Sequence, residues 1–145
     1  MLFRSGSMKQ VIKSEKAPAV VGPYSQAIKA GNLIFCAGQI GMDPKTNTLA
    51  EGVENQTRQA LENLKSVLKE AGVDLSNAVK TNVYLADMND FAAMNEIYGS
   101  FFTKPYPARA TIGAAKLPKG ALVEMDCIAY INQAGCCGGC CQDEE

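Results

Sequence analysis

Arg109 is a charged residue among small apolar neighbours, a setting in which its guanidinium needs a partner. It follows Pro105-Tyr106-Pro107 and lies between Ala108 and Ala110. Each proline fixes one φ angle and drives the preceding residue toward extended geometry, so we predict a strand that begins near Ala108. A guanidinium among alanines is costly to bury without an anion. Arg109 therefore either forms a salt bridge with an Asp or Glu, or grips the carboxylate of a small ligand through two parallel hydrogen bonds.

Glu124 is the second candidate, and it lies in the last predicted strand, residues 122–131. Alternation along this strand gives two faces. One face is apolar and can pack against helices: Val123, Met125, Cys127, Ala129 and Ile131. The other face mixes two carboxylates with large apolar side chains: Leu122, Glu124, Asp126, Ile128 and Tyr130. Because this mixture is unusual for a freely solvated face, we expect it to meet another copy of the chain.

We expect Arg109 and Glu124 to lie on adjacent strands. They then form either a structural ion pair or a ligand site at a subunit boundary, and the residues alone favour neither. Asp126, two residues from Glu124 on the same face, is expected to be structural or to lie at the interface. The sequence contains no histidine, which excludes Ser-His-Asp and Cys-His systems, imidazole bases and histidine metal sites. Acid–base chemistry must then come from carboxylates, Lys, Tyr, Cys or a bound water.

Length and composition are those of one ordinary globular domain. The chain has 145 residues, of which 47% are hydrophobic and 20% charged. The net charge of −1 provides no basic field that would attract nucleic acid or an anionic membrane, so neither is an expected partner. No apolar run approaches the ~20 residues that a membrane helix requires. Residues 1–7 resemble a cloning remnant, and the predicted domain spans residues 8–132.

The six cysteines divide into two kinds. Cys36 and Cys127 lie inside apolar strand patterns and are expected in the core. The other four crowd residues 133–145 and resemble a tetracysteine labelling tag that could chelate a soft metal: Cys136, Cys137, Cys140 and Cys141. We favour the alternative of a flexible tail without a part in the main function. The free thiols indicate a reducing compartment, the cytoplasm or the mitochondrion.

The remaining pattern predicts an α+β domain with a five- or six-stranded mixed sheet. Strands are indicated at residues 9–14, 25–30, 33–40 and 78–86, in addition to the two described above. Gly31-Asn32 predicts a hairpin between the second and third strands. Residues 43–47 are predicted as a loop.

Two segments show the apolar period of a helix. The first covers residues 52–71 and ends at Gly72, with glutamates near its start and lysines near its end, as the helix dipole favours. The second follows N-cap candidates at residues 87–90 and ends at Lys104-Pro105. We interpret its apolar stripe as core rather than as a cofactor site: Phe91, Met94, Ile97, Tyr98, Phe101 and Phe102. Two helices can cover only one face of such a sheet.

Several short blocks carry a resemblance to a known family. In order they are Gly22-Pro23-Tyr24-Ser25-Gln26-Ala27, Ala37-Gly38-Gln39-Ile40, Val79-Lys80-Thr81-Asn82-Val83-Tyr84-Leu85, Asp90-Phe91-Ala92-Ala93-Met94-Asn95, Pro107-Ala108-Arg109, and Leu117-Pro118-Lys119-Gly120 followed by Val123-Glu124-Met125-Asp126. Over about residues 8–132 the chain resembles the reactive intermediate deaminase family (RidA, or YjgF), also labelled L-PSP endoribonuclease.

The resemblance implies a fold like that of bacterial-type chorismate mutase and a homotrimer whose sites lie in clefts between subunits. It implies hydrolysis of 2-imino acids, such as 2-iminopropanoate and 2-iminobutanoate, to 2-keto acids and ammonia, with no metal and no cofactor. In that chemistry Arg109 holds the substrate's carboxylate and Glu124 orients a water and accepts its proton.

The family pattern matches four further residues to substrate binding. Tyr24 would line the cleft, Gly38 would let the backbone approach the ligand, Asn95 belongs to the site region, and Thr111 would bind through its N–H or hydroxyl. Their alternatives are a hairpin-core tyrosine, a packing glycine and a solvated or capping asparagine. Thr111 stands where many members have Cys, and Ala37 where Ser is common. These departures leave the substrate side chain and the turnover rate undefined.

Two other functions compete with deamination. One is the older family label of endoribonuclease or translation inhibitor, against which the net charge of −1 and the missing histidine both count. The other is a non-enzymatic small-ligand binder or chaperone. A binder would use the Arg109 grip but would tolerate Glu124→Gln.

Overall fold

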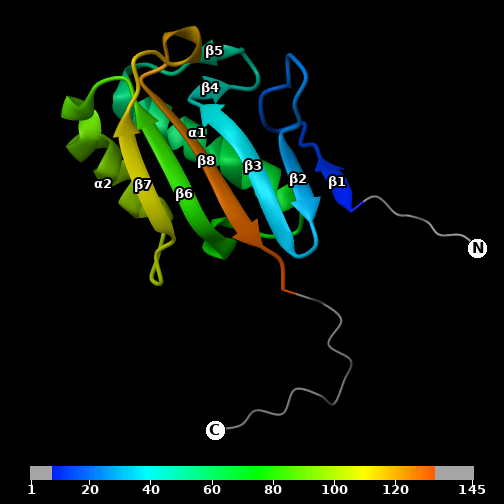
Figure 1. The fold of residues 1–145 in the computed structure, drawn as a ribbon. Helices are drawn as coiled ribbons and strands as arrows, with labels where there is room; N and C mark the ends of the chain where they lie inside the picture. Colours follow the sequence, from blue (N-terminus) through cyan, green and yellow to red (C-terminus); the bar gives the residue numbers. More distant parts are fainter. Residues whose placement is uncertain (1–7, 133–145) are drawn as a thin grey trace, which may run out of the picture.

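A six-stranded mixed sheet carries two helices on one face, as predicted (Figure 1). The computed structural model describes residues 8–132; the predicted leader (residues 1–7) and cysteine-rich tail (residues 133–145) lie outside the described residues. The sheet consists of β1 (Lys9–Ile12), β2 (Ala27–Ala30), β3 (Leu33–Ile40), β6 (Ala78–Leu85), β7 (Ala108–Gly113) and β8 (Val123–Tyr130). The helices are α1 (Gly52–Glu70) and α2 (Phe91–Phe101). Neither is long and apolar enough to cross a membrane.

The strand order is β1-β2-β3-β8-β6-β7, and only the pair β6 and β7 is parallel. A parallel neighbour requires a crossover connection, and α2 supplies it, which leaves β7 at the edge of the sheet. The last strand, β8, then pairs antiparallel with both β3 and β6. The predicted adjacency of the Arg109 and Glu124 strands is therefore wrong, because β6 lies between them.

Helix α1 follows its prediction closely. A Schellman motif ends it: the N–H of Val73 donates to the Leu68 carbonyl at 3.1 Å, and the N–H of Gly72 donates to the Lys69 carbonyl at 3.0 Å. Gly72 has φ 85°, a left-handed conformation that glycine adopts without steric cost. The helix is buried along its sheet-facing side, where Leu61, Leu64 and Leu68 are almost inaccessible.

Helix α2 ends earlier than predicted, at Phe101, because Phe102 is extended (φ −122°, ψ 149°). The polar segment before it forms the short 3₁₀ turn η2 (Met88–Asp90), in which the Asp87 carboxylate accepts a hydrogen bond from the N–H of Asn89 at 2.9 Å. Another 3₁₀ turn, η1 (Leu75–Asn77), precedes β6, and a third, η3 (Pro118–Gly120), precedes β8. The predicted loop at residues 43–47 is the turn of a small hairpin formed by β4 (Met42–Asp43) and β5 (Thr48–Leu49).

The core lies between the helices and the sheet. Both faces predicted for β8 are confirmed, since Val123, Met125 and Cys127 are buried while Glu124 and Asp126 are only partly covered. Cys36 and Cys127 are buried free thiols, as predicted. Val79 is an exception to the alternation along β6: Thr81, Val83 and Leu85 are buried, but a register shift between Ala78 and Lys80 leaves Val79 exposed.

The first two strands are shorter than predicted. The buried side chain of Gln26 replaces the ladder at this point, accepting a hydrogen bond from the N–H of Ser14 at 2.6 Å and donating to the carbonyls of Ser14 at 3.1 Å and Pro18 at 2.9 Å. Strand pairing between β1 and β2 therefore stops at Ile12 and Ala27.

Candidate functional site

Arg109 lies at the edge of the sheet and points toward α2. Its register partner in β6 is Thr81, which is buried on the helix side. The guanidinium donates from Nη1 to Oδ1 of Asn95 at 2.7 Å, and its Cζ lies 4.7 Å from the ring centroid of Tyr98 and 5.5 Å from that of Phe91. These contacts fix a half-buried cation in place without neutralising it.

No carboxylate among residues 8–132 pairs with Arg109. The salt bridge that competed with ligand binding is therefore not formed within the described chain. Arg109 has five N–H donors, and one amide oxygen satisfies only one of them. The others remain able to form the two parallel hydrogen bonds that a ligand carboxylate accepts.

Glu124 lies on the other face of the sheet. It is the register partner of Tyr84, whose side chain lies on the side away from the helices. The β3–β8 ladder shifts register between Cys36 and Gln39, and Gly38 lies inside this irregularity. A Cβ at Gly38 would meet Oε2 of Glu124 and lie 3.0 Å from Cδ. The glycine therefore leaves space for the carboxylate, which is the packing role considered for it.

Burial raises the pKa of Glu124, and the negative charge of Asp126 raises it further. No described residue donates a hydrogen bond to the Glu124 carboxylate. A carboxylate with a raised pKa and no bound partner is suited to accept a proton.

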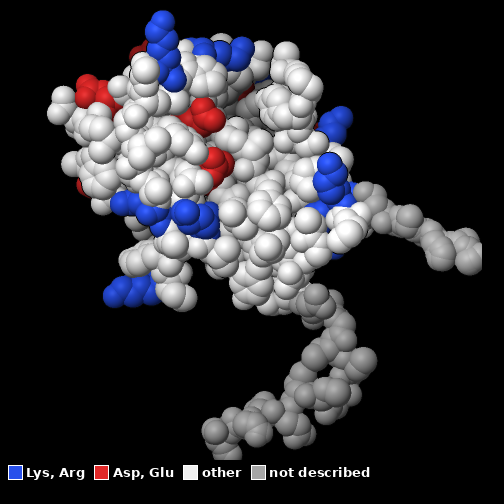
Figure 2. Space-filling view, in the orientation of Figure 1, with Lys and Arg blue, Asp and Glu red and all other residues white. Residues whose placement is uncertain are grey.

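Asp126, which was predicted to be structural or to lie at the interface, is held by two neighbours on β6. It accepts hydrogen bonds from Nδ2 of Asn82 at 2.8 Å and from the hydroxyl of Tyr84 at 3.1 Å. Burial and the Asp126 charge raise the pKa of Tyr84. Figure 2, which faces the side of the sheet opposite the helices, shows acidic atoms within this face and basic side chains mostly toward its margins.

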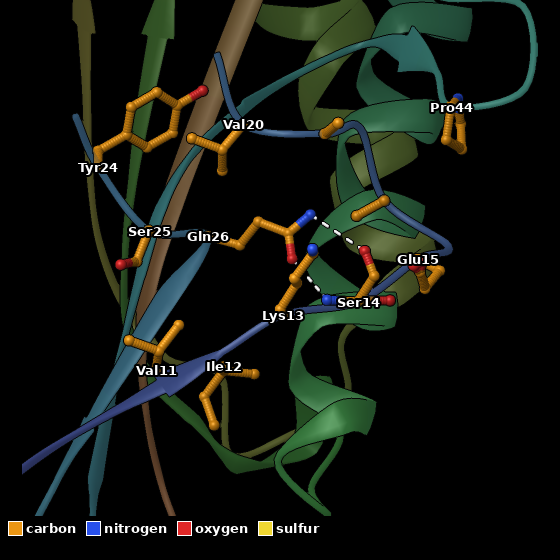
Figure 3. Close-up of a pocket in the computed structure, with 12 residues that line it drawn as sticks. Val11, Ile12, Lys13, Ser14, Glu15, Val20, Tyr24, Ser25, Gln26 and Pro44 are labelled. Carbon is orange, nitrogen blue, oxygen red and sulfur yellow. Dashed lines mark hydrogen bonds between the residues drawn. The ribbon is translucent and has the colours of Figure 1, made fainter. Parts of the chain in front are cut away.

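Tyr24 lies near the opposite edge of the sheet and is 56% exposed, so the hairpin-core alternative is wrong. It lines a cavity of about 460 Å³ between the β1–β2 region and the segment that joins these strands. Figure 3 shows Tyr24 together with Val20, Ser25 and Gln26 at this cavity. The buried Gln26, through its hydrogen bonds to Ser14 and Pro18, secures the segment that precedes Tyr24.

Thr111 follows Arg109 by two residues and has Val83 as its register partner, so it shares the helix side with Arg109. Its Oγ1 is buried and forms no hydrogen bond. A buried hydroxyl without a partner is uncommon in native proteins and is a candidate for ligand contact.

The predicted site residues occupy three separate places in one chain. Arg109, Asn95 and Thr111 lie on the helix side of the β7 edge, Glu124 and Gly38 on the open face, and Tyr24 near the opposite edge, at β1 and β2. A single chain therefore does not bring Arg109 and Glu124 to one ligand.

Two residues of this region were not recognised from the sequence as part of the site. Phe91 and Tyr98 were interpreted only as core, yet both rings contact the guanidinium of Arg109. Together with Asn95 they follow spacings of four and three residues, which places all three on one stripe of α2. The spacing of the two aromatic residues from Asn95, the asparagine matched to the family pattern, could have indicated this from the sequence.

This mixed sheet with two helices on one face defines a small α+β protein of the chorismate-mutase-like type, with an arginine and a glutamate on opposite sides of the sheet. Residues 14–131 match the model of the endoribonuclease L-PSP family. The chain belongs to this family, in which proteins named RidA and YjgF are also found.

Three similar proteins illustrate the relationship. A RutC family protein of Pyrococcus horikoshii is 53% identical, over 85% of this chain and 98% of its own length. The 2-iminobutanoate/2-iminopropanoate deaminase of Mus musculus is 48% identical, over 86% of this chain and 93% of its own length. The crystal structure of RidA from the Antarctic bacterium Psychrobacter sp. PAMC 21119 superimposes with a TM-score of 0.82 at 48% identity, covering 84% of this chain and 99% of that one.

Proposed function

We propose that this protein hydrolyses reactive 2-imino acids, such as 2-iminopropanoate and 2-iminobutanoate, to 2-keto acids and ammonia. The observation that carries the proposal is the guanidinium of Arg109, held by Asn95 and two aromatic rings but paired with no carboxylate in residues 8–132. Relatives named 2-iminobutanoate/2-iminopropanoate deaminase, such as the mouse protein, support the choice of substrate.

Arg109 would bind the substrate's carboxylate. A 2-imino acid carries that carboxylate directly beside its C=N bond, so a bidentate grip also fixes the carbon that water attacks. Thr111 would add its unpartnered hydroxyl on the same side of the strand. Asn95 would act by holding Nη1 of Arg109.

Glu124 would serve as the general base. It accepts a proton from a water molecule as the water oxygen bonds to the imine carbon, and the π electrons of the C=N bond move to nitrogen, which is protonated. The aminoalcohol then loses ammonia as the C–N bond breaks and the hydroxyl becomes the keto oxygen, so the atoms balance as imino acid plus water giving keto acid plus ammonia. The raised pKa of Glu124 brings the base closer to neutral pH.

We propose that the complete site forms between copies of the chain in a homotrimer. Arg109 lies at one edge of the sheet, whereas Glu124 lies on the open face and Tyr24 lies near the other edge. The open face also exposes large apolar side chains, including Phe35 and Tyr130, that a second copy would cover. A head-to-tail contact between the β7 edge of one copy and the open face of the next can repeat around a closed ring.

Complementation tests the shared site directly. Arg109→Ala and Glu124→Gln homotrimers should each lose imine hydrolysis, measured as the decrease in semicarbazone formed when an amino-acid oxidase supplies the imine. After unfolding and refolding as an equal mixture, about a quarter of the sites should combine an intact Arg109 with an intact Glu124 from different chains. Recovery of about that fraction of wild-type activity is expected. No recovery in verified mixed trimers would contradict a site shared in this way.

The same two variants distinguish the competing functions. The family model is described as an endoribonuclease, and RNA cleavage abolished by Arg109→Ala without imine hydrolysis in the wild type would support that function. A non-enzymatic binder would lose its ligand with Arg109→Ala and keep it with Glu124→Gln. The proposed deaminase requires both residues for turnover.

A further inference from the structure

The geometry points to Phe91 and Tyr98 as positioning residues that hold the guanidinium of Arg109 in the orientation required for carboxylate binding. Their ring centroids lie 5.5 and 4.7 Å from Cζ of Arg109, within the range of cation–π attraction. Both rings project from α2, as does Asn95, which accepts the hydrogen bond from Nη1 at 2.7 Å. The cation is thus oriented by one amide and two aromatic rings.

Tyr98 is itself held rigidly. Its side chain is 6% exposed, its ring stacks on Phe102 with centroids 4.5 Å apart, and its hydroxyl lies 2.7 Å from Oγ1 of the buried Thr81. Thr81 is also the register partner of Arg109 across the β6–β7 ladder. The contacts therefore close a loop that runs from the Arg109 backbone to Thr81, to Tyr98 and back to the guanidinium.

The contacts of the two rings and of Asn95 with the guanidinium have a consequence for binding. An arginine side chain has many rotamers, and part of that conformational freedom is lost whenever its guanidinium must be fixed against a ligand. Here the rings and the amide fix it before the ligand arrives, and neither ring consumes an N–H donor. Loss of a ring should therefore weaken carboxylate binding through Arg109 while leaving the acid–base step at Glu124 largely intact.

The inference rests on the proposed function only in taking a carboxylate as the ligand of Arg109. Its test uses Phe91→Leu and Tyr98→Leu, with Tyr98→Phe as the conservative variant that retains the ring. Phe101→Leu is the matched control, because Phe101 is a partly buried aromatic residue of α2 that packs against the core. Melting temperatures and trimer mass are measured for each, so that carboxylate binding is compared only among folded variants.

Three readouts are measured on the full-length protein: the Kd for 2-oxobutanoate by calorimetry, the KM and kcat for imine hydrolysis, and the NMR shift of the Arg109 Nε–H proton. We expect each ring-to-leucine variant to raise the Kd and the KM about tenfold with a smaller change in kcat. The upfield ring-current shift of the Arg109 proton should shrink in both. Tyr98→Phe, which keeps the ring, should bind 2-oxobutanoate like the wild type and show the wild-type Arg109 proton shift. Phe101→Leu should leave both the Kd and the proton shift unchanged.

Failure of this inference and failure of the proposed function give different results. If the wild type binds 2-oxobutanoate through Arg109 but hydrolyses no imine, the positioning role stands and the deaminase fails. If imine hydrolysis depends on Arg109 but folded Phe91→Leu and Tyr98→Leu keep the wild-type Kd, KM and proton shift, the positioning role is overturned. Phe91→Leu and Tyr98→Leu are also made in a chain that already carries Arg109→Ala. If they weaken 2-oxobutanoate binding there by the same factor as in the wild type, the positioning role is overturned, because the rings would then act independently of the cation.

Discussion

The carboxylate of Glu124 occupies the space in which a side chain at position 38 would begin. A Cβ at Gly38 would meet Oε2 of Glu124 and lie 3.0 and 3.2 Å from its Cδ and Cγ. The φ angle of Gly38 is not in the left-handed range, so a side chain here would displace the Glu124 carboxylate rather than strain the backbone. The register shift between Cys36 and Gln39 brings this backbone toward β8. One missing methyl group thus sets the position of the proposed base.

Gly38→Ala is expected to displace the Glu124 carboxylate and lower kcat for imine hydrolysis about 100-fold, as misplacement of a reacting group by about 1 Å does in other enzymes. Steady-state kinetics measure this. Gly99→Ala is the matched control, because a Cβ at Gly99 would meet no atom within 4 Å and α2 gains a better helix former. Wild-type kcat in folded Gly38→Ala would show that Glu124 needs no such space.

The pH dependence of turnover should report the Glu124–Asp126 pair. Burial and the Asp126 charge raise the Glu124 pKa, and a base works only when deprotonated, so the rate should fall as pH falls through that pKa. Asp126→Asn removes one of the two causes and should move this acidic limb to lower pH. The measurement is kcat/KM against pH. Glu70→Gln, an exposed charge change at the end of α1, should leave the limb in place; an unmoved limb in Asp126→Asn would contradict the coupling.

The ionised side chain of Glu124 should lower the free energy of unfolding near neutral pH. Its folded-state pKa lies above the usual value of 4.5, so its contribution to stability is fully present below about pH 4.5 and is lost as pH rises through the folded pKa. Glu124→Gln should therefore stabilise the protein at pH 7, by less than about 1 kcal/mol because the side chain is partly solvated. Thermal unfolding at pH 7 and pH 4 tests this: the gain should shrink at pH 4, and a lower melting temperature at pH 7 would contradict it.

Local patterns in the sequence were sufficient for the elements that carry the site. The period of α1 and the stop at Gly72 follow from neighbouring residues, and the two faces of β8 follow from alternation alone. These features depend on side chains within a few residues of one another, which a sequence displays directly.

The relation between Arg109 and Glu124 was not predictable in this way. Strand order depends on the side of the sheet to which a crossover helix returns the chain. Here α2 returns it to the outer side of β6, so β7 becomes the edge strand, and β8 then pairs between β3 and β6. The bulge at Gly38 and the contact of Tyr98 with Arg109 also depend on pairing between distant segments. The family resemblance identified the residues and implied sites between subunits, but it did not indicate that Arg109 and Glu124 lie on opposite faces of the sheet.

The segment before Tyr24 should depend on one buried amide. Gln26 is 3% exposed and its side chain satisfies the N–H and carbonyl of Ser14 and the carbonyl of Pro18. Gln26→Leu leaves these groups without partners and should lower the free energy of unfolding by about 2–4 kcal/mol. Urea denaturation measures the change. Gln10→Leu, at an exposed position of β1, should stay within about 0.5 kcal/mol; an equal effect of both substitutions would contradict the assigned role.

Cys127 should be chemically inert in the folded protein. Its thiol lies against that of Cys36 and is 1% exposed, and both the contact and the burial raise its pKa well above the usual value of 9.0. Only the thiolate reacts with iodoacetamide, so alkylation at pH 8 should be on the order of 100-fold slower than in the urea-unfolded chain, where access and thiolate formation are restored. Mass spectrometry of the Cys127 peptide follows this site separately from the other cysteines. Alkylation at the unfolded rate under native conditions would show that β8 opens readily, and the buried face assigned to it would be wrong.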